Sequence, residues 1–202
     1  MPKVAVVYHS GYGHTAVVAD KIAQGAREAG ADVELVRIEG AADDFAPALA
    51  ALADADAIVF GAPTYMGDVS AAFKAFAEAT SKVFAVFGWK DKLAGGFTVG
   101  GSLSGDKTRS LETFAELAAQ HGMVWVNLGI EPTSLPAADR GPQVVNRLGS
   151  FVGVQAQADN ASPEVTPPEG DRETARLYGV RIAEAARRWT AGAAAAPARL
   201  AA

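Results

Sequence analysis

The sequence predicts an α/β fold, in which a parallel β-sheet is covered by helices on both faces. Two observations support this class. The segments 4–8 and 57–61 are wholly apolar, as expected of parallel strands that are buried on both sides of a sheet. Apolar segments of this kind alternate along the chain with segments of helical periodicity. Such alternation favours right-handed crossover connections within one sheet.

The N-terminal half contains three predicted strands and two predicted helices. The strand at 4–8 leads into a helix at 15–29, whose apolar residues fall on one face and whose end is marked by a glycine. A half-alternating strand follows at 33–38, and an alanine-rich stretch predicts a short helix at 46–53. The apolar segment 57–61 is the third strand.

The C-terminal half continues the alternation. Aligned aromatic residues predict a helix at 69–80, and a glycine-rich strand follows at 93–101. Apolar residues with helical spacing predict a helix at 108–121, which a glycine ends before a fifth strand at 123–127. The last helix is predicted at 172–189, where large apolar residues recur in register.

One irregular, proline-rich segment interrupts this alternation at residues 130–171. Because structureless loops of this length are uncommon in a compact domain, we consider two interpretations. The segment is either a surface excursion packed on the domain or a flap near a ligand or a subunit interface. We expect a single domain over residues 1–190, with this insertion, and a disordered tail over residues 191–202.

Composition argues against several functional classes. The 202 residues include no cysteine, which removes disulfides, thiolate catalysis and cysteine-ligated metal centres. The three histidines lack the helical spacing of a metal site, so no metal is predicted. The formal net charge of −5, without a basic cluster, argues against nucleic-acid and membrane partners. No signal peptide or membrane-length apolar run is recognised, so we expect a cytoplasmic protein.

Three loops are candidates for a binding site. In an open parallel sheet, ligands bind beyond the carboxyl ends of the strands, where the strand order reverses. The loops after the first, third and fourth predicted strands are residues 10–15, 62–67 and 98–105. All three are rich in Gly, Ser, Thr or Tyr. This composition is not typical of a loop that only changes the direction of the chain.

The first loop has the features of an anion site. It lies between a strand and the N-terminus of a helix, where backbone amides are free and the helix dipole favours negative charge. Ser10 and Thr15 add hydroxyl groups. No lysine follows the last glycine, which excludes a Walker A loop. Gly11, Gly13 and Ala16 fit a dinucleotide-binding loop in part, so that alternative stays open.

The loop sequences resemble one known family. Residues 10–15, Ser-Gly-Tyr-Gly-His-Thr, resemble the FMN phosphate loop of flavodoxin-like proteins, in the form found in the WrbA branch of NAD(P)H:quinone oxidoreductases. Residues 60–70 resemble that family's G-x-P-T-R-[FY]-G-x-[MP]-[SA] segment, residues 97–102 its third flavin loop, and residues 121–123 the end of its next helix. The resemblance covers about residues 3–127 and the last helix. It implies a flavodoxin-like three-layer sandwich with a five-stranded parallel sheet in the order 2-1-3-4-5.

The resemblance implies FMN as the cofactor and assigns it three groups of residues. The first group would hold the phosphate, the second would lie beside the isoalloxazine ring, and the third would flank its other edge and the ribityl chain. These groups are Ser10, Gly11, Tyr12, Gly13, His14 and Thr15; Pro63, Thr64, Tyr65, Met66 and Gly67; and Val99, Gly100, Gly101, Ser102, Leu103 and Ser104. Tyr12 is also expected near the approach of the nicotinamide cofactor.

Three positions depart from the family pattern. Gln120 stands where many relatives have the histidine that faces the flavin, and the next residue, His121, is either a flavin ligand or a core or capping histidine. Phe84 occupies the place of a tryptophan that lines the substrate space in relatives. Tyr65 replaces an arginine beside the flavin.

The resemblance implies an FMN-dependent oxidoreductase that passes electrons from NADH or NADPH to quinones. The flavin carries the chemistry, so no catalytic side chain is required. The family is expected to form a homo-oligomer, a tetramer or a dimer, in which neighbouring subunits complete the flavin pocket. Two alternatives remain. One is a flavodoxin-type electron carrier with bound FMN and no NAD(P)H activity of its own, and the other is a flavin-free binding or regulatory protein.

Overall fold

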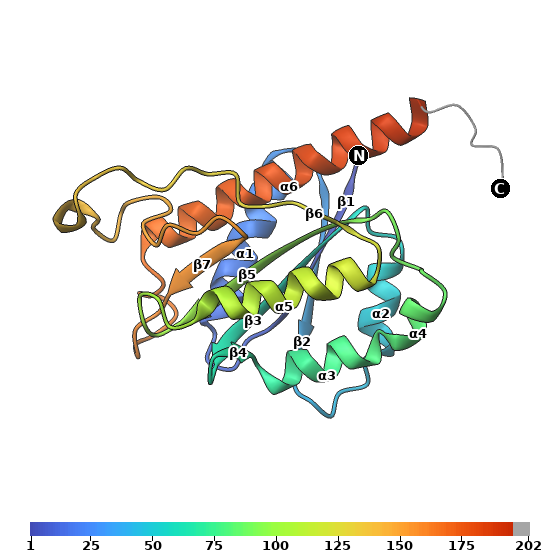
Figure 1. The fold of residues 1–202 in the computed structure, drawn as a ribbon, viewed down its shortest axis with the longest axis horizontal. Coiled ribbons are helices and arrows are strands. Elements are labelled where there is room, and N and C mark those ends of the chain that lie inside the picture. Colours follow the sequence, from blue (N-terminus) through green and yellow to red (C-terminus); the bar gives the residue numbers. More distant parts are fainter. Residues whose placement is uncertain (196–202) are drawn as a thin grey trace.

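A parallel sheet forms the middle layer of the computed structural model, which describes residues 1–195 (Figure 1). Its main strands lie in the order β2-β1-β3-β5-β6, and each neighbouring pair runs parallel. These strands are β1 (Lys3–His9), β2 (Asp32–Ile38), β3 (Ala57–Tyr65), β5 (Leu93–Gly100) and β6 (Val124–Trp125). The two wholly apolar segments of the sequence are therefore the inner strands β1 and β3, which confirms the predicted fold class.

Across residues 1–195 the sheet has seven strands, where the sequence predicts five. β4 (Asp68–Val69) pairs antiparallel with the end of β3 and lies off the main path. Because β4 is numbered but lies off the main path, the fourth and fifth strands of that path are β5 and β6, and the observed order differs in its labels from the predicted 2-1-3-4-5. β7 (Val154–Gln157) comes from the segment predicted to be irregular and pairs parallel with β5.

Two short strands share the place beside β5 at the edge of the sheet: β6, which lies within the predicted fifth strand at 123–127, and β7, which lies outside it. β6 pairs with Leu93 and Ala94 of β5, and β7 pairs with residues 97–100 of the same strand. Between them the chain leaves the sheet and includes a short 3₁₀ helix, η1, at Ala137–Asp139. Figure 1 shows this excursion projecting beyond the end of the sheet. A segment much later in the chain thus completes the outer strand beside the carboxyl end of β5.

Helices cover both faces of the sheet (Figure 1). They are α1 (His14–Glu28), α2 (Ala46–Ala53), α3 (Ala71–Ala79), α4 (Ser81–Ala85), α5 (Lys107–Gln120) and α6 (Glu169–Ala195). One apolar core joins α1 and α6 to the sheet, and a second joins α2, α3 and α5 to its other face. This gives the predicted three-layer sandwich.

Two helices differ from their predicted extents. The helix predicted at 69–80 starts later, because Val69 belongs to β4 and the Ser70 hydroxyl caps α3 by accepting a hydrogen bond from the Phe73 amide at 3.4 Å. Helix α6 continues to Ala195, so the prediction of a disordered tail is wrong for residues 191–195. The rest of the predicted tail lies outside the described residues.

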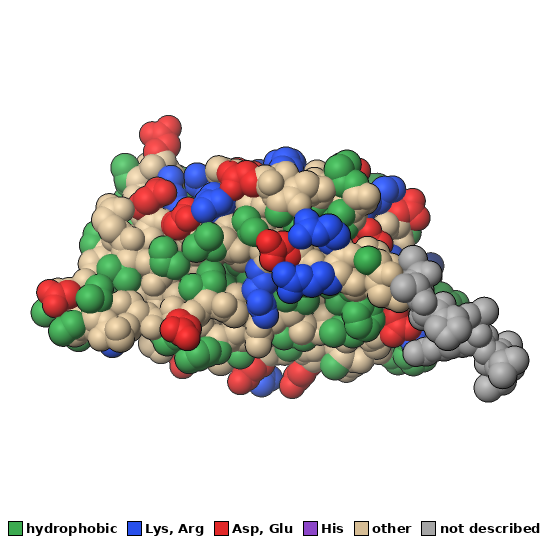
Figure 2. Space-filling view, turned by 90° about the horizontal axis from the view of Figure 1, so that it is seen from above, with side chains coloured by type: hydrophobic (Ala, Val, Ile, Leu, Met, Phe, Trp, Pro, Cys, Tyr) green, Lys and Arg blue, Asp and Glu red, His purple; other side chains and the backbone are tan. Residues whose placement is uncertain are grey.

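The outer face of α6 carries interleaved acidic and basic side chains (Figure 2). Arg176 forms ion pairs with Glu173 of the same helix and with Glu28 of α1. Arg188 pairs with Glu184 one helical turn away. Among the helices described over residues 1–195, none has the length and apolar character needed to cross a bilayer.

Candidate functional site

A pocket of about 430 Å³ opens at the carboxyl ends of β1, β3 and β5. The three loops predicted as a binding site meet there. The pocket is lined by four segments: Tyr12, His14 and Thr15; Pro63, Thr64 and Tyr65; Val99, Gly100 and Gly101; and Ala158, Asp159, Asn160 and Ala161. No sequence motif marks the fourth segment, which follows β7.

The loop between β1 and α1 holds a set of free backbone donors. Within the described residues, the amides of residues 11–15 donate no hydrogen bond, whereas the amides of Ala16 and Val17 are bound at 3.2 Å by the Ser10 hydroxyl and the Gly13 carbonyl. Gly13 has a φ of +91°, which glycine adopts readily. Free amides at a helix N-terminus attract anions. The loop can therefore hold an anion through uncharged donors.

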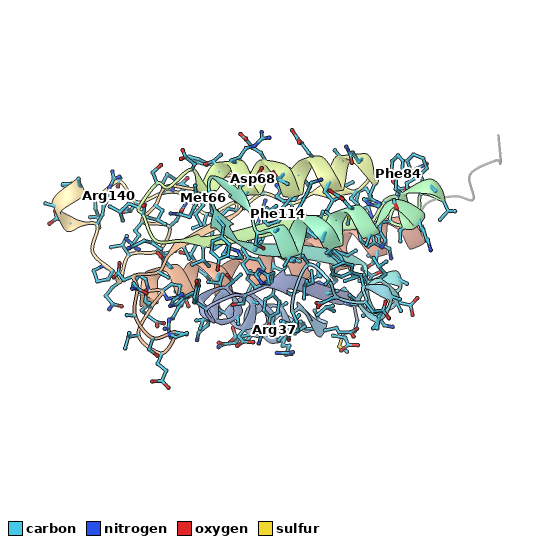
Figure 3. All side chains as sticks on the ribbon, turned by 90° about the horizontal axis from the view of Figure 1, so that it is seen from below. Arg37, Met66, Asp68, Phe84, Phe114 and Arg140 are labelled. Atoms are coloured by element: carbon cyan, nitrogen blue, oxygen red, sulfur yellow. The ribbon has the colours of Figure 1, made fainter. Side chains whose placement is uncertain are left out.

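Several predicted residues lie beside the pocket rather than in its lining. Met66 and Gly67 form the turn between β3 and β4 with φ of +49° and +86°, and Met66 is fully exposed (Figure 3). Leu103 is also exposed, on the loop that joins β5 to α5. The other predicted residues that do not line the pocket are Ser10, Gly11, Gly13, Ser102 and Ser104.

Two tyrosines meet at the mouth of the pocket. The rings of Tyr12 and Tyr65 are 6.4 Å apart in an edge-to-face arrangement. The Tyr65 hydroxyl reaches across to the first loop, where a Cβ atom on Gly11 would lie 2.6 Å from it. Burial raises the pKa of the Tyr65 hydroxyl, and Tyr12 raises it further. Tyr65 thus packs over the anion loop as an uncharged ring.

A chain of hydroxyl groups fixes the second loop against α5. The Thr98 hydroxyl donates to the Ala62 carbonyl at 2.7 Å, so it accepts from the Thr64 hydroxyl at 2.8 Å. The Thr64 oxygen in turn accepts from the Ser110 hydroxyl at 2.8 Å. Each hydroxyl has one proton to donate, and this order uses all three. Thr64 is therefore held in one orientation at the pocket wall.

The fourth segment is fastened over the first loop. His14 donates from Nε2 to the Ala161 carbonyl at 2.8 Å. Pro163 packs against Gly13, where a Cβ atom would lie 2.6 Å from the Pro163 ring. The Arg172 guanidinium of α6 donates to the carbonyls of Pro163 and Pro167 at 3.0 and 2.6 Å. This part of the predicted insertion is therefore a pocket wall, as in the flap interpretation.

Three predicted site residues, Gln120, His121 and Phe84, lie elsewhere in the fold. Helix α5 begins at Lys107 beside the third loop and ends at Gln120, just before β6. Because β6 pairs with the first residues of β5, this end of α5 lies at the amino edge of the sheet, opposite the pocket. Figure 3 shows Phe84 and Met66 well separated along the molecule. Within one described chain these three side chains do not line the pocket.

His121 is a packed core residue, with its side chain almost fully buried. The Thr80 hydroxyl donates to the Ala77 carbonyl at 2.7 Å, so the His121 Nε2 atom is the donor in its 2.9 Å bond to Thr80. The imidazole lies 4.5 Å from the Trp89 ring. Burial lowers the pKa of His121, which favours its neutral form. Of the two interpretations left by the sequence, the structure supports the core histidine.

Comparison with known proteins places this architecture in a family. Residues 2–130 match the model of the NADPH-dependent FMN reductase family. The chain is 45% identical to Flavodoxin FldP of Pseudomonas aeruginosa (strain UCBPP-PA14), over 91% of this chain and 96% of the relative. It is 32% identical to an NAD(P)H dehydrogenase (quinone) of Paracoccus denitrificans (strain Pd 1222), over 95% of this chain and 97% of the relative.

Among solved structures, a WrbA-like flavodoxin from Agrobacterium tumefaciens superposes with a TM-score of 0.72. It is 40% identical in sequence, and the match covers 93% of this chain and 99% of that one. The resemblance inferred from the loop motifs is thus confirmed over almost the full length. The chain belongs to the NADPH-dependent FMN reductase family and has a flavodoxin-like fold of the WrbA type.

Proposed function

We propose that the pocket binds FMN and that the protein is an oxidoreductase that transfers electrons from NADH or NADPH to quinones. The observation that carries the proposal is the set of free amides at residues 11–15. They form an anion site without a lysine or arginine in the pocket lining, beside a wall of three further segments. This arrangement fits a phosphate monoester attached to a larger group. Family membership and the printed names of relatives support the same cofactor and reaction.

Each part of the chain has a defined task in this proposal. Bound FMN would supply the hydride and electron transfer between the nicotinamide and the acceptor, so the protein's task would be binding and orientation. The amides of residues 11–15 hold the phosphate, and the Thr98–Thr64–Ser110 hydroxyl chain fixes the second loop. Tyr12 is 77% exposed at the mouth, which leaves room for a second substrate to approach.

We also propose that the protein assembles as a homo-oligomer, a tetramer or a dimer. The residues displaced from the pocket, Gln120 and Phe84, could meet it only if a second copy supplies them. Phe84, Val86 and Phe87 are exposed together on α4 and the turn after it, which forms an apolar surface that a second copy would cover. Light scattering coupled to size exclusion tests this directly, and a monomer at micromolar concentration would refute it.

A flavodoxin-type electron carrier is the second candidate. One specific observation favours it: Tyr12 in the pocket lining is exposed, as are Met66 on the second loop and Leu103 on the third, and exposed apolar side chains of this kind suit docking of a protein partner. The name of the FldP relative agrees with this candidate.

Reconstitution with FMN separates the two candidates. The purified protein is titrated with FMN, and oxidation of NADH and of NADPH is followed with and without benzoquinone. Quinone-dependent turnover supports the oxidoreductase. Bound flavin that neither nucleotide reduces supports the carrier. Failure to bind FMN at high micromolar concentration would overturn both.

A further inference from the structure

Lys107 is a lysine in an unfavourable place. Its side chain is fully buried, although lysine is almost never buried without a partner. It is the first residue of α5, where the positive end of the helix dipole opposes a cation. The ammonium donates hydrogen bonds to the carbonyls of Ser102 and Leu103, the latter at 3.0 Å. Both acceptors belong to the third loop of the site.

The third loop has few other restraints. Residues 101–106 are exposed, and Gly105 and Asp106 both have a φ of +55°. Apart from the Lys107 ammonium, three bonds restrain these residues. The Gln157 side-chain amide donates to the Gly101 carbonyl at 3.1 Å, the Lys107 backbone amide to the Ser104 carbonyl at 3.3 Å, and the Arg109 amide to the Asp106 carbonyl at 3.0 Å. The stem of Lys107 lies directly behind the pocket wall, because a Cβ atom on Gly100 would be 3.4 Å from its Cγ and 3.9 Å from its Nζ.

The charged groups that face Lys107 do not neutralise it. Arg147, from the excursion between β6 and β7, forms a buried two-bond ion pair with Asp171 of α6, at 2.8 and 3.0 Å. Asp171 also accepts from the Gln157 backbone amide at 2.8 Å. Burial lowers the pKa of Lys107 to about 8; Asp171 opposes this shift and Arg147 adds to it. Lys107 therefore loses its proton in mildly alkaline solution. Hydrogen bonds from the neutral amine are weaker than those from the charged ammonium.

We propose that Lys107 is a positioning residue of the flavin site, whose buried ammonium holds the loop of residues 101–105 in the shape that binds FMN. The proposal rests on FMN binding as proposed above. Burial and the helix N-terminus both make a cation at this position destabilising, so stability alone does not explain a lysine here. Its hydrogen-bond acceptors belong to an exposed loop of the site, which gives it a positioning role. Methionine has a similar shape without charge, and the loop carbonyls can bind water when the ammonium is absent. The substitution Lys107→Met should therefore leave the fold intact.

Lys92 provides a matched control. It too donates to two backbone carbonyls, those of Ala53 and Ala55 at 2.7 and 2.6 Å, and burial also lowers its pKa. It lies just before β5, at the edge of the sheet opposite the pocket. Lys92→Met repeats the chemical change away from the loop.

The test measures the NMR order parameters of the Cα–H bonds of residues 101–105 in the FMN-free protein and the dissociation constant of FMN, both between pH 7 and about 9. In Lys107→Met we expect lower order parameters confined to the loop, an unchanged or raised melting temperature, and FMN affinity weaker by roughly tenfold. The wild type should approach the variant as pH rises through 8, and Lys92→Met should match the wild type.

Order parameters that are unchanged in Lys107→Met would overturn the proposal, as would lower order parameters over the whole chain with a lowered melting temperature. FMN affinity equal to that of the wild type would overturn it as well. If the wild type binds no FMN while order parameters change only in the loop, the proposed function fails and the role of Lys107 in holding the loop stands.

Discussion

Gly179 of α6 packs directly on the backbone of α1: a Cβ atom at position 179 would lie 2.0 Å from the Ile22 carbonyl oxygen. Gly25 makes the reciprocal contact, since a Cβ atom there would lie 1.8 Å from the Arg176 carbonyl oxygen. Two glycines, one on each helix, thus let the two backbones touch. Because α1 begins at the anion loop, this contact also helps to fix the position of the loop.

Replacement of Gly179 by alanine should destabilise the protein by about 3 kcal/mol, because one helix must move away from the other. The measurement is urea unfolding followed by circular dichroism. Gly192→Ala is the control, since it lies in the same helix with no atom within 4 Å of its Cβ position. It should be neutral or stabilise by up to about 1 kcal/mol. Equal effects of the two substitutions would contradict the close backbone contact.

An aspartate at position 15 should repel the phosphate of FMN without harming the fold. Thr15 is buried in the first turn of α1 and lines the pocket. A carboxylate there suits the helix dipole, so the melting temperature should not fall. Two like charges about 4 Å apart at a partly buried site cost on the order of 3 kcal/mol, so FMN affinity should drop roughly 100-fold.

Riboflavin, which lacks the phosphate, is the control ligand for Thr15→Asp. Its affinity should change little, so fluorescence titrations with both flavins isolate the phosphate contribution. If both flavins lose affinity equally, the phosphate does not sit on this loop. Gly13→Asp would be a poor substitute, because its side chain would meet the Pro163 ring instead of the pocket.

Most of the fold and three of the four pocket segments could be predicted from the sequence. Continuous apolar strands and helical periodicity are local signals, and the loops at strand ends follow from the topology. β7 could not be predicted, because a four-residue strand separated from its continuation by a long excursion carries too weak a pattern. The ion pair between Arg147 and Asp171 likewise could not be predicted from the sequence, because tertiary packing determines which charged residues are buried together. Family resemblance alone points to Gln120 and Phe84 as site residues, whereas the topology of a single chain puts them at the opposite edge of the sheet.

Lys107 should cost stability at neutral pH. Its pKa in the folded chain is lowered by burial from 10.5 to about 8, so the unfolded chain binds the proton more tightly. The resulting decrease in the free energy of unfolding is complete below pH 8 and disappears as pH rises to 10.5. It amounts to about 3 kcal/mol at most. Lys107→Met should therefore unfold at higher urea than the wild type at pH 7, and the gap should close by about pH 10. A variant less stable than the wild type at pH 7 would contradict this sign.

His121 should make the protein acid-sensitive. Burial lowers its pKa below the ordinary 6.5, so the folded state requires the neutral ring. The stability that depends on this ring is fully present above pH 6.5 and is lost as pH falls further. The loss reaches at most about 1.4 kcal/mol per pH unit for one proton.

Glutamine at position 121 can still donate to the Thr80 hydroxyl but does not titrate. We therefore expect His121→Gln to be less stable than the wild type at pH 7.5 and to lose stability more slowly between pH 6.5 and 5, as measured by urea unfolding at each pH. Burial also lowers the pKa of His9, so some acid sensitivity should remain in the variant. If the free energy of unfolding falls with pH at the same rate in the two proteins, protonation of the His121 ring does not destabilise the folded state.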